Sequence, residues 1–120
     1  MRALIVDDSS TMRAILRITL KKKGFEVLEA KNGVHALSVL GSSDPVELML
    51  VDWNMPEMNG FELISQVRLD HRYDSIKIMM VTTETGMSEM SNALNAGANE
   101  YIMKPFTSEV VGEKLQLLGL

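Results

Sequence analysis

The sequence has no cysteine among its 120 residues and no long apolar run. Without cysteine, the chain can form neither a disulfide bond nor a thiolate metal site. A helix that crosses a bilayer needs about 20 consecutive apolar residues, and the apolar run before Asp7 is too short for the core of a signal peptide. We therefore expect a cytoplasmic protein that does not associate with a membrane.

An excess of positive charge is also missing. Lys and Arg number 12 against 16 for Asp and Glu, which gives a net charge of −4. Nucleic-acid-binding domains usually carry a basic patch, so we expect no nucleic-acid partner. Linkers and low-complexity tracts are absent as well, and 46% of the residues are hydrophobic. This composition predicts a single domain over residues 1–120, with a core that needs no cross-links.

Five short apolar runs alternate with segments of helical periodicity. The runs 3–6, 46–51 and 76–81 are nearly continuous, which is typical of strands covered on both faces, and the runs 25–30 and 99–103 alternate more, as edge strands do. Helical spacing follows each run, at residues 9–24, 32–41, 60–70, 87–97 and 107–120. Five such repeats predict an α/β fold, a five-stranded doubly wound parallel sheet of the flavodoxin-like type with helices on both faces.

The first of these helices has clear end signals and an apolar side. Ser9 or Ser10 can cap its start, and Gly24 can end it. Its apolar positions recur at three- and four-residue steps, at Met12, Ile15, Leu16 and Leu20, and the basic residues Arg13, Arg17 and Lys21 fall on the other side.

Polar residues follow four of the five apolar runs. Asp7 and Asp8 come after the first, Asp52 after the third, Thr82 after the fourth and Lys104 after the fifth. In an open parallel sheet the carboxyl ends of the strands share one edge, where ligands bind. Two carboxylates about 5 Å apart repel by roughly 3 kcal/mol at an effective dielectric constant of about 20. Three carboxylates at one edge therefore predict a bound cation besides Lys104, and Mg²⁺ suits such oxygen ligands.

A simpler interpretation exists for each residue alone. A single Asp after a strand usually caps a helix or forms a turn, but Ser9 and Ser10 are already available to cap the helix after Asp8. The gathering of acids from two strand ends favours the metal site. His35 and His71 have no metal-ligand neighbours, and we interpret both as surface residues.

Four segments resemble the receiver domains of two-component response regulators, most closely the stand-alone, CheY-like chemotaxis type. They are IVDDSSTMRAILR, LMLVDWNMPEMNGFELI, MMVTTETG and NEYIMKPFT. The resemblance covers essentially all 120 residues. It implies the strand order 2-1-3-4-5 known for this family, a histidine kinase as phosphodonor, and a phosphorelay that resets by hydrolysis.

The resemblance also implies the roles of the residues at the metal and phosphate site. Asp52 corresponds to the phosphoacceptor, and Asp7 and Asp8 to the acidic pair. Together with Asp52 and the backbone carbonyl of Asn54, this pair would hold Mg²⁺, for which Mn²⁺ can substitute. Lys104 corresponds to the lysine that contacts the phosphoryl group.

Further residues correspond to the switch and to the tuning of hydrolysis. Thr82 matches the hydroxyl that bonds the phosphoryl group, and Tyr101 the aromatic ring whose orientation follows activation. Asn54 and Glu84 are positioned to influence the attacking water. The Lys104–Pro105 peptide is cis in the family, and the resemblance implies the same here for Pro105.

The expected partners follow from the same resemblance. Phosphorylation would reshape the face of the fourth helix, fifth strand and fifth helix for a protein target, and a phosphatase can act on the product. The chain would be a monomer or a weak activation-dependent dimer, and no enzyme beyond its own phosphorylation and dephosphorylation. Motor-binding members tend to carry lysines near the start of the fourth helix, where this chain has Glu84, Met87, Glu89 and Met90. The sequence therefore leaves open whether the target is a flagellar motor.

Three alternatives remain open. A phosphatase of the haloacid dehalogenase type also uses Asp, Lys, Thr and Mg²⁺, but that class has a second acid where this chain has Asn54, and it needs a cap. A flavodoxin needs a hydroxyl-rich phosphate loop after the first strand, where Asp7 and Asp8 would repel a flavin phosphate. The chain can also be the receiver part of a longer regulator.

Overall fold

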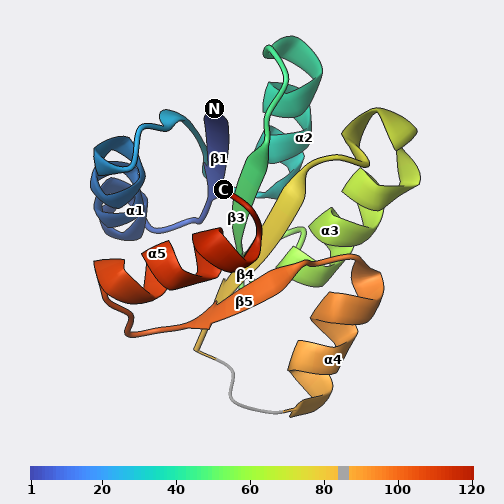
Figure 1. Ribbon diagram of the computed structural model, residues 1–120. Helices are drawn as coiled ribbons and strands as arrows, with labels where there is room; N and C mark the ends of the chain where they lie inside the picture. The colour runs from blue at the N-terminus through green and yellow to red at the C-terminus, as the bar shows by residue number, and fades with distance from the viewer. Residues whose placement is uncertain (84–86) are drawn as a thin grey trace.

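The computed structural model describes the backbone of residues 1–83 and 87–120, and the side chains of residues 1–83 and 90–120. Its centre is a five-stranded parallel sheet in the order β2-β1-β3-β4-β5, which confirms the predicted fold class and strand order (Figure 1). The strands are β1 (Arg2–Val6), β2 (Glu26–Ala30), β3 (Leu48–Asp52), β4 (Lys77–Thr82) and β5 (Glu100–Met103). The helices are α1 (Ser10–Lys22), α2 (Gly33–Ser42), α3 (Gly60–Leu69), the 3-10 turn η1 (His71–Tyr73), α4 (Met87–Ala96) and α5 (Ser108–Leu117).

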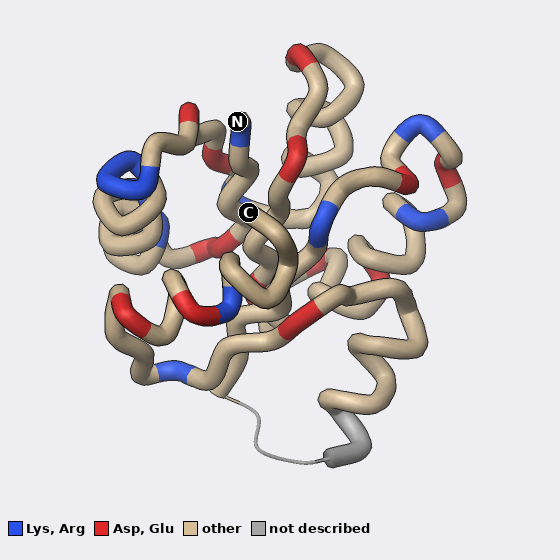
Figure 2. Tube along the Cα trace, in the orientation of Figure 1, with Lys and Arg blue, Asp and Glu red and all other residues tan. Residues whose placement is uncertain are grey.

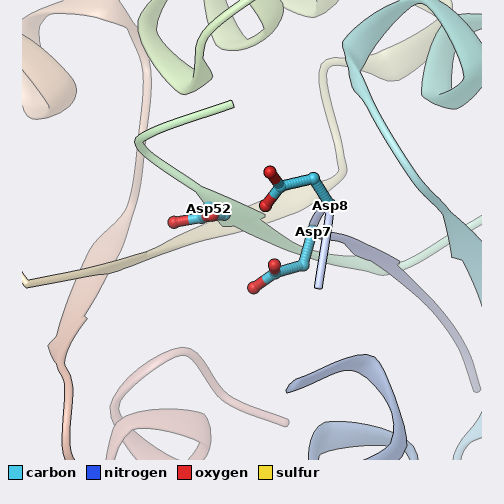
Figure 3. Close-up of side chains that lie close together, drawn as sticks. All are labelled: Asp7, Asp8 and Asp52. Atoms are coloured by element: carbon cyan, nitrogen blue, oxygen red, sulfur yellow. The ribbon is translucent and has the colours of Figure 1, made fainter. Parts of the chain in front are cut away.

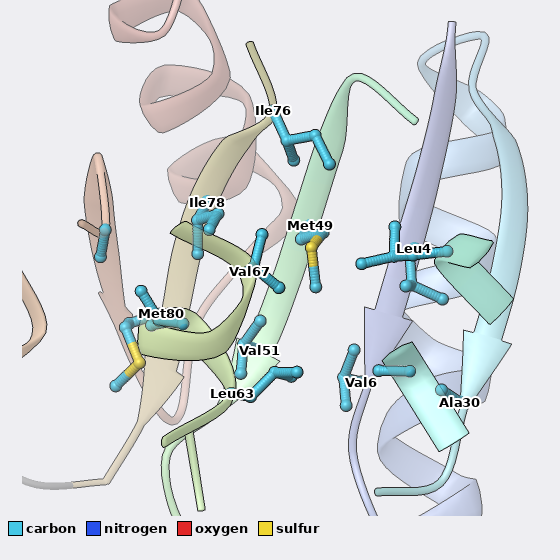
Figure 4. Packing of buried hydrophobic residues seen from close by; sticks show 14 of the residues in the cluster. Leu4, Val6, Ala30, Met49, Val51, Leu63, Val67, Ile76, Ile78 and Met80 are labelled. Carbon is cyan, nitrogen blue, oxygen red and sulfur yellow. The ribbon is translucent and has the colours of Figure 1, made fainter. Parts of the chain in front are cut away.

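Helices cover both faces of the sheet. In Figure 1, α1 and α5 lie on one side and α2, α3 and α4 on the other. Because successive side chains of a strand point to opposite faces, β1 contributes Leu4 and Val6 to the core under α2, α3 and α4, and Ala3 and Ile5 to the core under α1 and α5. Figure 4 shows the first of these cores, where residues of the central strands pack against α3.

Polar residues cap the starts of α1 and α3. Ser9 caps α1, with its side chain accepting from the backbone N–H of Met12, so one of the two predicted caps is confirmed. At α3, Asn59 and Glu62 form a reciprocal capping box. Each cap lies just beyond the carboxyl end of a strand, so it turns the chain back over the sheet at the edge where the polar residues gather.

The apolar side of α1 is narrower than its periodicity predicts. Leu16 and Leu20 are buried, whereas Ile15 is 47% exposed, so its placement among the core positions was wrong. Ile18 is exposed as well, at 54%. The helix packs on β1 and the edge strand β2, and only Leu16 and Leu20 of α1 are buried.

Charged residues of both signs are spread along the chain. In the part of the chain coloured in Figure 2, acidic and basic segments alternate rather than gather into one basic face, in keeping with the net charge of −4. None of the described helices is long and apolar enough to span a bilayer.

Candidate functional site

The register of the sheet brings the ends of β1, β3 and β4 together. Val6 is paired with Val51, so Asp7 follows β1 beside the point where β3 ends in Asp52. Asp52 in turn is paired with Val81, and Thr82 ends β4 on the other side. The predicted gathering of polar groups at the carboxyl edge therefore follows directly from the strand order.

Asp7, Asp8 and Asp52 form an acidic cluster at this edge. Each offers a carboxylate oxygen, and the three oxygens lie within 4.8 Å of one another. Figure 3 shows the three side chains next to each other, two from the segment after β1 and one from the end of β3. Asp7 and Asp52 are buried, at 1% and 7% exposure, and Asp8 is exposed to solvent. The cluster is thus open on the Asp8 side.

Lys104 supplies a positive charge to the cluster from the end of β5. Its Nζ lies 3.4 Å from Oδ2 of Asp7 and 3.5 Å from Oδ1 of Asp52. Its backbone N–H donates to the carbonyl of Thr82, which ties the β5 end to the β4 end. The next peptide bond, Lys104–Pro105, is cis, as the resemblance implies.

One lysine does not balance the acids. Burial raises the pKa of Asp52 from its ordinary value of 3.8 to about 6, and the charge of Asp7 adds to the rise. Lys104 and a hydrogen bond from the backbone of Asn54 act in the opposite direction and are too weak to cancel it. A further cation next to Asp52 would therefore stabilise the ionised form of its carboxylate.

The acidic cluster suits a small divalent cation with oxygen ligands. Two oxygens that both contact Mg²⁺ at about 2.1 Å lie about 3 to 4.2 Å apart in an octahedral shell. The spacing of the three carboxylate oxygens, all within 4.8 Å of one another, is close to that range. The open side at Asp8 leaves room for the water ligands that Mg²⁺ usually keeps.

The segment after Asp52 holds the end of β3 in place. Gly60 donates its N–H to the carbonyl of Trp53, and a Cβ added at Gly60 would lie 2.7 Å from the carbonyl oxygen of Asp52. Only glycine therefore allows α3 to start this close to the strand. Trp53 is partly exposed and meets Phe61 edge to face, with ring centroids 6.1 Å apart.

The predicted switch residues lie on two neighbouring strands. Thr82 is buried at the end of β4. Tyr101, on β5, is partly buried, and the Nζ of Lys114 from α5 lies 4.8 Å from the centre of its ring. Lys114 also contacts Glu100 at 3.1 Å. Glu84, predicted to tune hydrolysis, lies outside the described residues.

The family of the chain follows from a match over nearly its whole length. Residues 3–116 match the family model of the response regulator receiver domain. The chain belongs to this family. A receiver domain was expected from the resemblance of four segments, and that expectation is confirmed.

The relatives of this receiver domain include chemotaxis proteins. It is 50% identical over 119 residues to the chemotaxis protein CheY1 of Helicobacter pylori strain J99, which covers 98% of this chain and 96% of that protein. It is 51% identical over 117 residues to a chemotaxis protein CheY homolog of Campylobacter jejuni strain 81-176, covering 97% and 90%. The solved structure of the chemotaxis response regulator CheY4 of Vibrio cholerae has a TM-score of 0.91 at 34% identity, covering 98% and 97%.

One residue of the site was not recognised in the sequence. Arg13 was placed on the side of α1 away from the core, but its Nη1 donates to the backbone carbonyl of Asp7 at 2.6 Å. The signal was weak, because a basic residue on the polar side of a helix ordinarily faces water. His35 and His71, by contrast, are exposed as predicted.

Proposed function

We propose that this receiver domain is phosphorylated on Asp52 by a histidine kinase and acts in chemotaxis-type signalling. The observation that carries the proposal is the position of Asp52, a buried carboxylate at a strand end with two further acids and Lys104 around it. The chemotaxis assignment is supported by the relatives of about 50% identity.

The reaction is a phosphoryl transfer between a phosphohistidine and Asp52. A carboxylate oxygen of Asp52 attacks phosphorus, an O–P bond forms, and the P–N bond to the donor imidazole breaks with its electron pair returning to the ring. The product is an aspartyl phosphate. Positioning of the reacting groups and electrostatic stabilisation lower the barrier to phosphoryl transfer more than covalent chemistry does. The charged groups around Asp52 therefore contribute most to the reaction.

The cation of this site is Mg²⁺ in our proposal, with Mn²⁺ able to replace it because it accepts the same oxygen ligands. Asp7, Asp8, Asp52 and the backbone carbonyl of Asn54 would hold it. When bound, it offsets the negative charge of the carboxylates and of the incoming phosphoryl oxygens. Lys104 contributes one more positive charge, with its Nζ 3.5 Å from Oδ1 of Asp52.

Activation is proposed to pass through Thr82 and Tyr101. The phosphoryl group adds about 1.5 to 2 negative charges, and the Thr82 hydroxyl donates a hydrogen bond to it. Tyr101 then turns inward and leaves its contact with Lys114, which changes the face made by α4, β5 and α5. A protein target binds this face.

Dephosphorylation resets the switch, with Asn54 and Glu84 influencing the attacking water. The chain acts only on its own phosphoryl group and is no enzyme toward other substrates; a separate phosphatase can shorten the phosphorylated state. We propose a cytoplasmic receiver domain, monomeric or weakly dimeric after activation, without a nucleic-acid or membrane partner.

Incubation with Mg²⁺ and acetyl phosphate or phosphoramidate, followed by intact-mass measurement, tests the phosphorylation. The expected result is a gain of one phosphoryl group that disappears with chelator and in Asp52→Asn. Asp74→Asn, an exposed aspartate remote from the cluster, is the matched control and should gain the group like the wild type. A wild-type chain that gains no phosphoryl group would overturn the proposal.

The metal assignment has its own test. Trp53 follows Asp52 directly and is partly exposed, so its fluorescence should change during a Mg²⁺ titration. Asp8→Ala should weaken this response. An unchanged titration in Asp8→Ala would show that Asp8 is not a ligand.

A further inference from the structure

Arg13 reaches from α1 back to the end of β1. Helical side chains lean toward the N-terminus of their helix, and here the lean carries the guanidinium over the first turn to the backbone of Asp7. Its Nη1 donates to the Asp7 carbonyl at 2.6 Å, and its side chain is only 19% exposed. The contact is to a backbone atom, so it does not pair Arg13 with any carboxylate of the acidic cluster.

The guanidinium is held from its other side by β2. Nε of Arg13 lies 3.3 Å from one carboxylate oxygen of Glu29, and Nη1 of Arg17 lies 2.7 Å from the other. Arg13 and Arg17 are one helical turn apart, so a single carboxylate aligns both. Bonds between ionised groups are the stronger ones. Glu29 therefore fixes the direction in which Arg13 approaches Asp7.

Asp7 is fixed through every polar group that it has. Its N–H donates to the carbonyl of Ala30, Oδ1 accepts from the N–H of Ser9, and Oδ2 contacts Lys104. The carbonyl, bonded to Arg13, is the fourth group. That carbonyl belongs to the peptide group that leads into Asp8, so its direction sets the direction of the next residue.

Asp8 depends on this peptide group. Its side chain is exposed, and in the described part of the chain no hydrogen bond or ion pair restrains its carboxylate. Its oxygen nevertheless stands within 4.8 Å of those of Asp7 and Asp52. The backbone therefore sets the direction of the Cα–Cβ bond of Asp8, and with it the region that its carboxylate can reach.

We propose that Arg13 is a positioning residue for the metal site: by holding the peptide group between Asp7 and Asp8, it keeps the Asp8 carboxylate within reach of a Mg²⁺ ion shared with Asp7 and Asp52. The inference rests on the function proposed above, because it concerns how the same site selects its cation. Mg²⁺ demands a nearly ideal octahedral shell, whereas Ca²⁺ accepts irregular ones. Arg13 thereby favours Mg²⁺ over Ca²⁺.

Arg13→Lys tests whether the shape of the guanidinium group or only its positive charge is needed. Lysine keeps the positive charge but replaces the rigid planar fork by a flexible stem with a point charge, so it cannot hold Asp7 and Glu29 together in the same way. Arg17→Lys is the matched control, since it is the same substitution on the same helix and against the same carboxylate, without a contact to Asp7. Glu29→Gln is a second variant, which loosens Arg13 without altering α1.

The experiment measures Mg²⁺ and Ca²⁺ dissociation constants of the full chain by isothermal titration calorimetry. Arg13→Lys should weaken Mg²⁺ binding by about tenfold, the smaller effect typical of losing a residue that orients a metal ligand. It should weaken Ca²⁺ binding by less than about threefold. Glu29→Gln should show the same pattern with a smaller loss. Arg17→Lys should leave both constants unchanged.

Three results would overturn the inference. They are Mg²⁺ binding by Arg13→Lys equal to that of the wild type, an equal loss in Arg13→Lys and Arg17→Lys, and an equal loss for Mg²⁺ and Ca²⁺. If Arg13→Lys does not fold, Glu29→Gln tests the inference instead, by comparing its loss of Mg²⁺ affinity with its loss of Ca²⁺ affinity. If the wild-type chain binds no Mg²⁺, the proposed function itself is contradicted. If the wild type binds Mg²⁺ and Arg13→Lys binds it equally well, only the role of Arg13 is contradicted.

Discussion

The ammonium group of Lys104 lies 3.5 Å from Oδ1 of Asp52, although Asp52 ends β3 and Lys104 follows β5, 52 positions further along the chain. The pKa of Asp52 is nevertheless raised to about 6 by burial and by Asp7. Lys104 therefore lowers the free-energy cost of placing ionised carboxylates together at this edge of the sheet, but it does not remove that cost. The metal-free site stays strained electrostatically, and this has consequences for stability and for metal binding.

The contribution of Asp52 to the stability of the metal-free protein should fall as the pH rises through the interval from about 4 to about 6. A folded pKa of about 6 lies above the ordinary 3.8, so in this interval the folded state binds more protons than the unfolded state, and stability decreases with pH. The full cost above this interval is up to about 3 kcal/mol. Asp52→Asn should remove it. Urea unfolding with chelator at pH 4 and pH 8 measures the difference between Asp52→Asn and wild type, and a difference that does not grow with pH contradicts the prediction.

Lys104→Met should bind Mg²⁺ more tightly and yet be phosphorylated more slowly. The ammonium group lies within 3.5 Å of two carboxylates of the acidic cluster, so it repels a cation that binds there. Its removal should tighten Mg²⁺ binding by about tenfold, which the Coulomb energy of charges at this range amply supplies. The phosphoryl group loses a positive partner, so the rate with acetyl phosphate should fall. Weaker Mg²⁺ binding in Lys104→Met would mean that the lysine organises the acids rather than competing with the cation.

The positions of Asp7, Asp52 and Lys104 could be predicted from the sequence for a simple reason. Each follows an apolar run, and in a parallel sheet all carboxyl ends share one edge. The prediction needed only the strand ends, and those are marked by the change from apolar to polar residues. Neither the rotamers nor the loops had to be known.

Arg13 and Arg68 could not be predicted in this way, because each bonds to backbone carbonyls. Arg68 donates to the carbonyls of Gly97, Tyr73 and Ile76 and to the side chain of Asn99. A carbonyl is present at every position, so no residue type marks the partner of such an arginine. Ile15 is 47% exposed although it lies on the apolar side of α1, since periodicity gives the direction of an apolar face but not how much of it the neighbouring elements cover.

Arg68→Met should destabilise the fold by about 2 to 4 kcal/mol, because it leaves several carbonyls without a donor. The guanidinium joins the end of α3 to the turn between α4 and β5, and its burial lowers its pKa. Arg72→Met is the matched control, since Arg72 is exposed and pairs with Asp70 at the surface. It should change stability much less than Arg68→Met does, because exposed ion pairs contribute little. Equal losses in urea unfolding for the two variants would contradict a structural role particular to Arg68.

Gly60→Ala should disturb the phosphorylation site directly. The added Cβ would meet the Asp52 carbonyl oxygen at 2.7 Å and the Cα of Trp53 at 2.9 Å, both backbone atoms that cannot rotate away. A loss of about 1 to 3 kcal/mol is expected from such overpacking, with slower phosphorylation by acetyl phosphate. Gly41→Ala has open space around it near the end of α2 and should be neutral or stabilising by up to about 1 kcal/mol. A phosphorylation rate in Gly60→Ala equal to that of Gly41→Ala would show that the strand end tolerates displacement.

Glu57→Gly should stabilise the protein, contrary to the usual effect of glycine. Glu57 has φ 68 in the loop between Asp52 and α3, and this left-handed conformation costs an ordinary residue roughly 1 to 2 kcal/mol. Glycine adopts it freely but loses more chain entropy on folding, so a net gain of about 0.5 to 1 kcal/mol is expected. Glu113→Gly makes the same substitution at an exposed position within α5, where it should cost about 1 kcal/mol. The two variants should therefore shift the urea midpoint in opposite directions, and a loss of stability in both would mean that the loop holds Glu57 without strain.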